Sequence, residues 1–325
     1  MTKLSIFRVF QRSAILGLLS VSIGTLATEQ GPAERLLEKM FHASSTVNYS
    51  GLVTYEKASR IKTAEILHLT NGDFSFRKIN HLDGPKGQYS KLLPANNCAP
   101  LIPYGDDRNA LSILSKDSIK QIKNSYHFDI IRPIGNVSQR VAGRDVTTVI
   151  IRPKDRHRLP LKFSIDDQSG VVLKSELFNL EGRALERFQF IKLTVGGELD
   201  LLQIPDNKHQ NEVNCNLVFD RAVIDSWNFG WMPSNFLIRK AERSVSSGRD
   251  TLVFSDGLAV VTVFIELPKL KSSLPELELN YGGASVVSIK NKSQKKVFNA
   301  SVVGEIPLAT ARKIAQSVAY SSDTT

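Results

Sequence analysis

The clearest pattern in the chain is an alternation of apolar and polar residues between positions 139 and 195. Leu161, Phe163 and Ile165 alternate with polar or charged neighbours, and Phe188 and Phe190 do the same further along. Because successive side chains of a strand point to opposite faces, this spacing predicts strands with one apolar and one solvated face. Turn sequences containing glycine separate five predicted antiparallel strands, at residues 139–141, 146–151, 161–166, 171–178 and 185–195.

Other elements precede this sheet. Pro32 suits a first helical turn, and the apolar residues of 36–41 recur at helical spacing, which predicts a short helix. Alternation then predicts strands at 50–57, 64–70 and 73–80, with Asn71-Gly72 as a hairpin turn. Residues 84–112 are rich in Pro, Gly and Asn, so we expect a loop with short strands there, followed by a helix at 115–126.

A second β-rich unit follows an almost wholly polar stretch, residues 203–216, which we interpret as an interdomain linker. Strands are predicted at 217–226, 236–241, 251–254, 258–266, 284–290 and 297–303. Pro307 then begins a helix that we expect to reach about residue 320, because Leu308, Ala311, Ile314 and Val318 form an apolar stripe. The chain is therefore predicted to be mainly β with helices (α+β), with domains at 28–202 and 217–321.

The first 27 residues have the features of a secretory signal peptide. Lys3, Arg8 and Arg12 precede a small, apolar run at 13–24, and small residues follow at 25–27. The run is shorter than the roughly 20 apolar residues with which a helix spans a bilayer. A cleaved signal is thus favoured over a membrane anchor, and we expect an exported, soluble mature chain.

Cleavage of that segment changes what the charge implies. The whole chain carries a formal net charge of +10, and loss of Lys3, Arg8 and Arg12 leaves +7. A basic protein attracts nucleic acid, anionic lipid or acidic proteins. An exported protein rarely meets nucleic acid, so anionic lipid and acidic proteins remain as expected partners.

The sequence shows no recognisable catalytic motif. A G-x-S-x-G elbow, a phosphate-binding glycine loop and H-E-x-x-H are absent, and the six histidines are dispersed. A Ser/His/Asp site assembled in space stays open as a third hypothesis. The two cysteines, Cys98 and Cys215, are too far apart in sequence to show whether they pair. We expect a binding protein without enzymatic activity, metal or cofactor.

Three groups of residues are candidates for binding. A basic loop has cationic side chains that match phosphate or carboxylate, although such a run is more often a solvated hairpin tip: Arg152, Lys154, Arg156 and Arg158. The second domain offers aromatic anchors and a polar turn as a partner surface: Trp231, Phe236, Arg239, Ser255, Asp256 and Gly257. Aromatic residues of the first sheet belong either to a core or to a cavity for acyl chains: Tyr55, Phe74, Phe76, Phe163, Phe188 and Phe190.

Short motifs occur in order along nearly the whole mature chain. The first domain carries V-N-Y-S-G at 47–51, L-D-G-P at 82–85, G-R-D at 143–145 and I-R-P-K-D-R at 151–156. The second carries W-M-P-S-N-F at 231–236, F-S-D-G-L at 254–258, V-F-I-E at 263–266 and V-V-G-E-I-P at 302–307. This ordered set resembles the RseB/MucB family, periplasmic negative regulators of the sigma-E type envelope-stress response. The sequence departs from the family pattern after the basic loop, where it reads H-R-L-P-L-K, and over 84–112.

The resemblance implies a fold and a function. The first domain would be an unclosed half-barrel like that of periplasmic lipoprotein carriers, with helices on its concave face, and a smaller β domain would end in a helix. The protein would bind the periplasmic part of a membrane-bound anti-sigma factor and shield it from proteolysis until lipopolysaccharide or lipoprotein acyl chains favour release. A periplasmic lipid or lipoprotein carrier is the alternative, and a homo-oligomer stays open.

Overall fold

The computed structural model of the 325-residue chain describes residues 31–70, 74–84, 87–94, 116–131, 139–196, 219–267, 276–293 and 296–321. The expected signal peptide, the linker at 203–216, both cysteines and the Asn71-Gly72 turn lie outside the described residues. From Gly31 onward the chain forms one compact unit. No helix among the described residues is long and apolar enough to cross a membrane.

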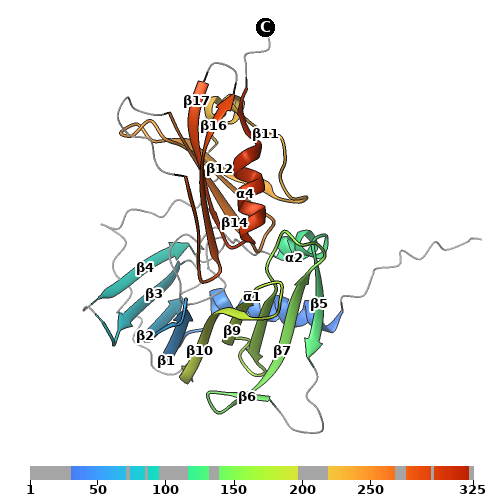
Figure 1. Cartoon of the computed structure of the whole chain (residues 1–325). Helices are drawn as coiled ribbons and strands as arrows, with labels where there is room; N and C mark the ends of the chain where they lie inside the picture. The colour runs from blue at the N-terminus through green and yellow to red at the C-terminus, as the bar shows by residue number, and fades with distance from the viewer. Residues whose placement is uncertain are drawn as a thin grey trace, which may run out of the picture. The chain divides into compact units, whose positions relative to one another are not determined.

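Strands make up most of the described chain (Figure 1). The helices are α1 (Pro32–Thr46), α2 (Lys116–Lys123), α3 (Arg221–Ser226) and α4 (Leu308–Ser317). The strands of the first sheet are β1 (Tyr49–Lys57), β2 (Arg60–Thr70), β3 (Phe74–His81), β4 (Gln88–Pro94), β5 (Tyr126–Ile131), β6 (Gln139–Val141), β7 (Arg144–Pro153), β8 (Leu161–Asp166), β9 (Val172–Phe178) and β10 (Ala184–Val195). Later strands are β11 (Trp227–Phe229), β12 (Leu237–Arg243), β13 (Asp250–Ser255), β14 (Val260–Glu266), β15 (Leu277–Tyr281), β16 (Ala284–Ser293), β17 (Lys296–Gly304) and β18 (Val318–Tyr320).

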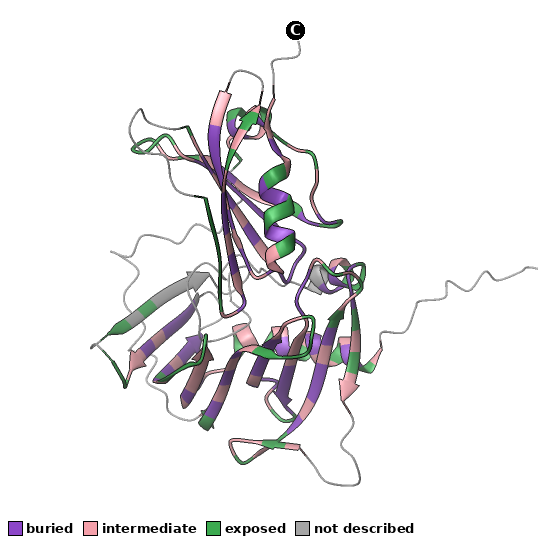
Figure 2. Ribbon diagram, viewed as in Figure 1, coloured by how far each residue is buried: buried purple, intermediate pink, exposed green. Residues whose placement is uncertain are grey.

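The first sheet has ten strands and is not closed on itself. Its order is β4-β3-β2-β1-β10-β9-β8-β7-β5, with β6 paired to β7, and the described pairs are antiparallel. Strands β1 and β10, far apart in sequence, pair from Tyr49 opposite Val195 to Lys57 opposite Glu186 and join the two halves of the sheet. Buried and accessible residues alternate along β7 and β10 (Figure 2). The expected unclosed, mainly β first domain is confirmed.

Helices α1 and α2 cover one face of this sheet. The apolar stripe of α1 buries Leu37 and Met40, and Ile119 and Ile122 of α2 join them against Phe163 and its neighbours. Pro32 stands at the start of α1, where its missing N–H costs no hydrogen bond. Helix packing therefore protects the apolar side of the alternating pattern from water.

Gly51 explains why the V-N-Y-S-G motif contains a glycine. A Cβ atom at this position would lie 2.6 Å from the Phe190 ring and 2.4 Å from the Lys192 carbonyl oxygen. Phe190 occupies the vacated space and meets the Tyr49 ring edge-on, with 5.9 Å between centroids. The glycine thus allows an aromatic cluster to form across β1 and β10.

The second sheet has six strands in the order β12-β13-β14-β17-β16-β15. Helix α4 packs its buried residues, including Ala311 and Ile314, against β16 and β17. In Figure 2 the buried and exposed residues of α4 lie on opposite sides of the helix. This confirms the expected second β domain with a terminal helix.

Two predictions about this domain are wrong in detail. Residues 221–226 form helix α3 instead of a strand, because the Asp220 side chain accepts hydrogen bonds from the N–H groups of Ala222 and Val223 and caps a helix there. The last helix ends at Ser317, and Val318–Tyr320 form β18, which pairs with β11. The apolar residue Val318 is buried as expected, but in a strand.

Candidate functional site

The basic loop between β7 and β8 contains one arginine that does not face solvent. Arg152, Lys154 and Arg156 are exposed, whereas the side chain of Arg158 is completely buried. Its Nε donates to the Asp256 carboxylate, one terminal nitrogen donates to Asp155, and the other donates to the Ser234 carbonyl oxygen. Arg158 therefore joins the first sheet to the second and, in this arrangement, offers no surface for a phosphate.

Asp256 lies at the turn between β13 and β14 and is also fully buried. Its Oδ1 accepts the N–H groups of Leu258 and Ala259, at 3.0 and 2.9 Å, and its Oδ2 accepts the Tyr126 hydroxyl at 2.9 Å as well as Arg158. Neighbouring Ser255 and Gly257 are buried too, and the Ser255 hydroxyl accepts the Gly257 N–H. Four donors thus surround this carboxylate, which holds the turn and the joint together.

Aromatic rings enclose the ion pair. The Arg158 guanidinium lies 4.9 Å from the centroid of the Phe236 ring and 5.8 Å from that of Tyr126. Burial, followed by the negative charge of Asp256, raises the pKa of Tyr126 well above its ordinary value. The phenol therefore stays protonated and remains a donor to Asp256.

More polar contacts extend this joint along α2. Asn235 donates from Nδ2 to the Ser125 hydroxyl oxygen at 3.0 Å, and Arg239 donates to the Gln121 amide oxygen at 3.0 Å. Asn235 has a positive φ of 66°, a conformation that asparagine tolerates better than most residues. These side chains come from the W-M-P-S-N-F motif and the strand after it, which gives that motif a structural role.

Trp231 lies beside the same joint but keeps part of its surface accessible. The His157 ring approaches its edge, with 4.9 Å between centroids, and the Lys313 ammonium lies 3.9 Å from its ring centroid. The His157 ring also lies within hydrogen-bonding distance of Thr310 in α4. Of the expected partner-binding residues, Trp231 and Arg239 are partly accessible, while Phe236, Ser255, Asp256 and Gly257 are buried.

A second contact between the sheets involves the β15–β16 turn. Gly283 donates its N–H to Glu186 Oε1 at 2.9 Å, and the Lys57 ammonium lies 5.5 Å from the Tyr281 ring centroid. Glu186 also accepts Lys57 at 2.8 Å and the Tyr55 hydroxyl. The two sheets are thus joined at two places by buried polar groups.

The six aromatics expected to line a lipid cavity do not share one face of the sheet. Cross-strand register places Tyr55, Phe163, Phe188 and Phe190 on the helix-covered face, where the three phenylalanines are buried in the core. Ile79 of β3 pairs with Ile66 on the helix-covered face. Phe76, three residues before Ile79, pairs with Leu69 and therefore lies on the opposite face of the sheet. Phe74 begins β3, and its side chain is not among those described.

The buried polar residues of the joint hydrogen-bond to one another and to the backbone. Within the described ranges, no three His, Cys, Asp or Glu residues gather to hold a metal ion. Ser255 hydrogen-bonds within its own turn, and Asp256 is committed to four donors. Sequence reasoning missed Tyr126, Glu186 and Gly283 as joint residues. The one sequence signal for this joint was the F-S-D-G-L motif at 254–258, which predicted a polar turn in the second domain.

Both folded parts of the chain match known domains. Residues 32–210 match the sequence profile of the MucB/RseB N-terminal domain, and residues 222–319 match that of the MucB/RseB C-terminal domain.

Characterised relatives are similar over almost their full lengths. The sigma factor AlgU regulatory protein MucB of Pseudomonas aeruginosa is 27% identical over 94% of this chain and 96% of its own. The sigma-E factor regulatory protein RseB of Haemophilus influenzae is 23% identical over 93% and 96%.

Solved structures give the same result. The MucB chain in the complex structure of Pseudomonas aeruginosa MucA/MucB is 25% identical, with a TM-score of 0.69 over 90% of this chain and 100% of its own. MucB in complex with MucA(peri) is 26% identical, with a TM-score of 0.68 over 89% and 99%. The two sheets and the buried joint between them define a mainly β protein of two parts. Since the two profiles together span most of its length, the chain belongs to the MucB/RseB family.

Proposed function

We propose that this chain is an exported regulatory protein that binds the periplasmic part of a membrane-bound anti-sigma factor and protects it from regulated proteolysis. The observation that carries the proposal is similarity across both domains, without truncation, to MucB crystallised with MucA. Release of the partner would follow a lipid or lipoprotein signal. On this proposal the protein works in the periplasm and performs no catalysis.

The buried joint supports a regulatory function because it couples the two domains. A ligand frees a partner only if it binds the partner-free conformation more tightly. A joint built from Arg158, Asp256 and Tyr126 favours one arrangement of the domains, so a signal that acts on one domain can reach the other.

Accessible residues beside the joint are the proposed contacts. Trp231 and Arg239 have exposed surface on the second domain, and Arg152, Lys154 and Arg156 are exposed on the first. The buried residues Phe236, Ser255, Asp256, Gly257 and Arg158 would act by fixing the joint. An acidic partner segment would then be attracted by the basic loop, and this attraction would weaken with salt.

The test uses the mature full-length protein and the periplasmic segment of its anti-sigma factor. We expect the segment to bind, and its cleavage by the site-1 protease to slow at saturating protein. Equal cleavage rates with and without the protein would contradict the proposal. Trp231→Ala should weaken binding, whereas Leu279→Ala, a change at an exposed apolar residue of β15, is the matched control.

A further inference from the structure

The second sheet joins the first sheet at one of its ends. The β13–β14 turn with Asp256 and the β15–β16 turn with Gly283 both contact the first sheet at that end. Because the strands pair antiparallel, the β12–β13 turn and the last residues of β14 and β16 lie at the opposite end of the sheet. We call this the far end, and its described residues are 243–250, 266–267, 290–293 and 296–299.

Lysines of the far end have no carboxylate partner among the described residues. Lys290 and Lys292 are exposed, and neither forms an ion pair within the described ranges. They are two residues apart on β16, so both side chains point to the same face of the sheet. The Lys296 ammonium, on the neighbouring strand, lies 3.3 Å from the centroid of the Tyr320 ring. The far end thus keeps positive charge that the protein itself does not neutralise there.

Acidic residues at this end are already paired with arginines. The buried Asp250 carboxylate accepts hydrogen bonds from Arg243 at 2.6 and 2.8 Å. Glu266 lies 3.7 Å from Arg249, whose guanidinium group also lies 4.8 Å from the centroid of the Phe264 ring. Because these arginines are held by contacts within the domain, the uncommitted cations of the far end are its lysines.

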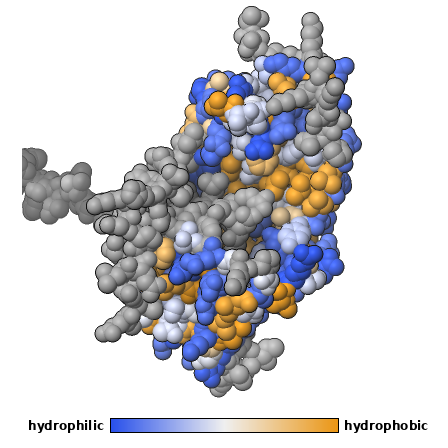
Figure 3. Space-filling model, turned by 90° about the vertical axis from the view of Figure 1, so that its left-hand side faces the viewer, coloured by the Kyte–Doolittle hydropathy of each residue, from blue (hydrophilic) through white to orange (hydrophobic). Residues whose placement is uncertain are grey.

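An apolar side chain projects from the same end. Val245, in the β12–β13 turn, is fully exposed. Backbone hydrogen bonds hold this turn, from the Gly248 N–H to the Ser244 carbonyl oxygen at 2.8 Å and from the Ser244 N–H to the Arg249 carbonyl oxygen at 2.9 Å. Leu267, after the end of β14, is half exposed. Figure 3 shows orange, apolar areas beside blue, hydrophilic ones on the second domain.

Strand order brings the apolar and the basic features together. Only β14 lies between β13, which follows the Val245 turn, and β17, which pairs with the lysine-bearing strand β16. Neighbouring strands are about 4.8 Å apart, so β13 and β17 are separated by about 10 Å. A single flat surface can therefore meet Val245 and the lysines at the same time.

We propose that the far end docks on the surface of an anionic lipid bilayer. Negative head groups attract each lysine near a membrane surface, and an exposed apolar side chain enters the interface. Lysine is a compact point charge on a flexible stem, which suits a diffuse array of phosphates. A carboxylate-bearing peptide is better matched by arginine forks, and the arginines here are committed. Docking goes beyond the proposed function, and it would leave the joint turned away from the lipid.

Co-sedimentation of the mature full-length protein with lipid vesicles tests the proposal. We expect binding to phosphatidylcholine vesicles that contain about 30% phosphatidylglycerol, and none to phosphatidylcholine alone. Binding should weaken as the salt concentration rises, because salt screens exposed charges. The double variant Lys290→Gln/Lys292→Gln should bind about tenfold more weakly, since each lysine near an anionic surface contributes severalfold. Val245→Ser should weaken binding about threefold, because it removes an apolar contact.

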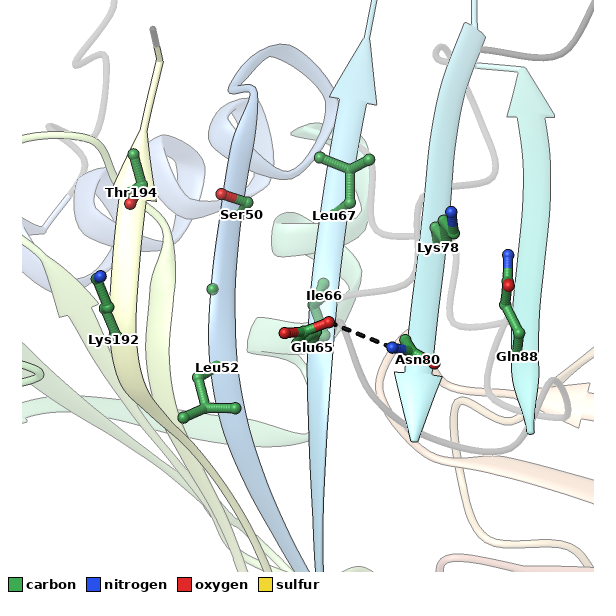
Figure 4. Close-up of a pocket in the computed structure, with 11 residues that line it drawn as sticks. Ser50, Leu52, Glu65, Ile66, Leu67, Lys78, Asn80, Gln88, Lys192 and Thr194 are labelled. Carbon is green, nitrogen blue, oxygen red and sulfur yellow. Dashed lines mark hydrogen bonds between the residues drawn. The ribbon is translucent and has the colours of Figure 1, made fainter. Parts of the chain in front are cut away.

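The double variant Lys78→Gln/Lys192→Gln is the matched control. It removes the same charge from the first sheet, where Figure 4 shows both lysines. Equal weakening by the two double variants would overturn the proposal, as would equal binding to the two kinds of vesicle. Binding of polyglutamate without binding of vesicles would assign the lysines to an acidic peptide and overturn it as well. The anti-sigma segment is absent throughout, so these outcomes are independent of whether that segment binds.

Discussion

The side chains of Arg158, in the β7–β8 loop of the first sheet, and Asp256, in the β13–β14 turn of the second, form an ion pair that is completely buried. Loss of Asp256 would leave the Arg158 guanidinium buried with Asp155 as its remaining carboxylate partner, and loss of Arg158 would leave the Asp256 carboxylate as a buried charge. Tyr126 and the turn N–H groups complete the shell of the carboxylate. The relationship makes the joint strongly sensitive to single substitutions.

Removing one member of this pair should be costly. Asp256→Asn is expected to lower the free energy of unfolding by about 3 kcal/mol, because it removes one of the two carboxylates that the buried Arg158 guanidinium contacts and leaves only Asp155. Urea unfolding followed by tryptophan fluorescence measures the change. Arg152→Gln, which breaks the exposed pair of Arg152 with Asp129, is the control and should cost no more than about 1 kcal/mol. Similar losses for the two variants would show that the buried pair has no special weight.

A substitution at Gly283, in the β15–β16 turn, should disturb the second contact between the two sheets. A Cβ atom on Gly283 would lie 2.1 Å from Leu177 Cδ2, so Gly283→Ala is expected to push the turn away from Glu186. Hydrogen exchange at this amide, which donates to Glu186 in the wild type, should become faster. Gly230→Ala is the matched control, since its added Cβ would meet nothing closer than 3.5 Å. Unchanged protection in Gly283→Ala would contradict this expectation and show that the Leu177 side chain moves aside while the turn stays in place.

The packing of Phe190 over Gly51 predicts a rescue. Gly51→Ala is expected to lower the free energy of unfolding by about 1–3 kcal/mol through overpacking. A smaller side chain in Phe190→Leu should recover part of that loss in the double variant, which a thermodynamic cycle of the four proteins would detect. Strictly additive losses would mean that the ring does not occupy the space of the missing Cβ.

His68 should make stability depend on pH. Burial, then the positive charge of Arg77, lowers the pKa of His68 to about 4 from an ordinary 6.5. The pKa of His68 is lower in the folded than in the unfolded protein. The contribution of His68 to the free energy of unfolding is therefore complete above pH 6.5 and is lost as the pH falls from 6.5 to 4. The loss amounts to about 3 kcal/mol.

Urea unfolding at pH 7 and pH 4.5 tests this pH dependence by comparing the variant His68→Gln with the control variant His127→Gln. The histidine ring lies 2.8 Å from the Val47 carbonyl oxygen and 2.7 Å from the Ser75 hydroxyl oxygen, and an amide can replace both contacts. His68→Gln should lose less stability on acidification than His127→Gln, which alters an exposed histidine. Equal losses would assign the acid sensitivity to other groups.

Alternation made most of the fold predictable. The strand at 161–166 was expected at the bounds that the structure has, and most other strands differ by a few residues. Propensity failed at 221–226, where β-branched residues suggest a strand but the Asp220 cap nucleates a helix. The strand Tyr126–Ile131 was missed because it follows helix α2 with hardly any turn sequence between them.

The site was harder to predict than the fold. Arg158 belongs to a basic run that looks uniformly solvated, and only the tertiary position of Asp256 separates it from its exposed neighbours. Likewise, the grouping of aromatics by sheet failed because Phe76 and Phe188 point to opposite faces, which depends on register across several strands. Local patterns specify which residues are apolar; pairing between distant segments decides what they meet.

The pairing of β18 with β11 has a consequence for the order of folding. Trp227 at the start of the second domain contacts Tyr320 near the end of the chain, with 5.4 Å between ring centroids. The first sheet has all of its described strands once Val195 has been made, whereas β11 of the second domain still needs Val318–Tyr320 as its partner. During synthesis the second domain is therefore completed after the first, and a chain that stopped before Val318 would leave the Trp227 ring exposed on the side that Tyr320 covers.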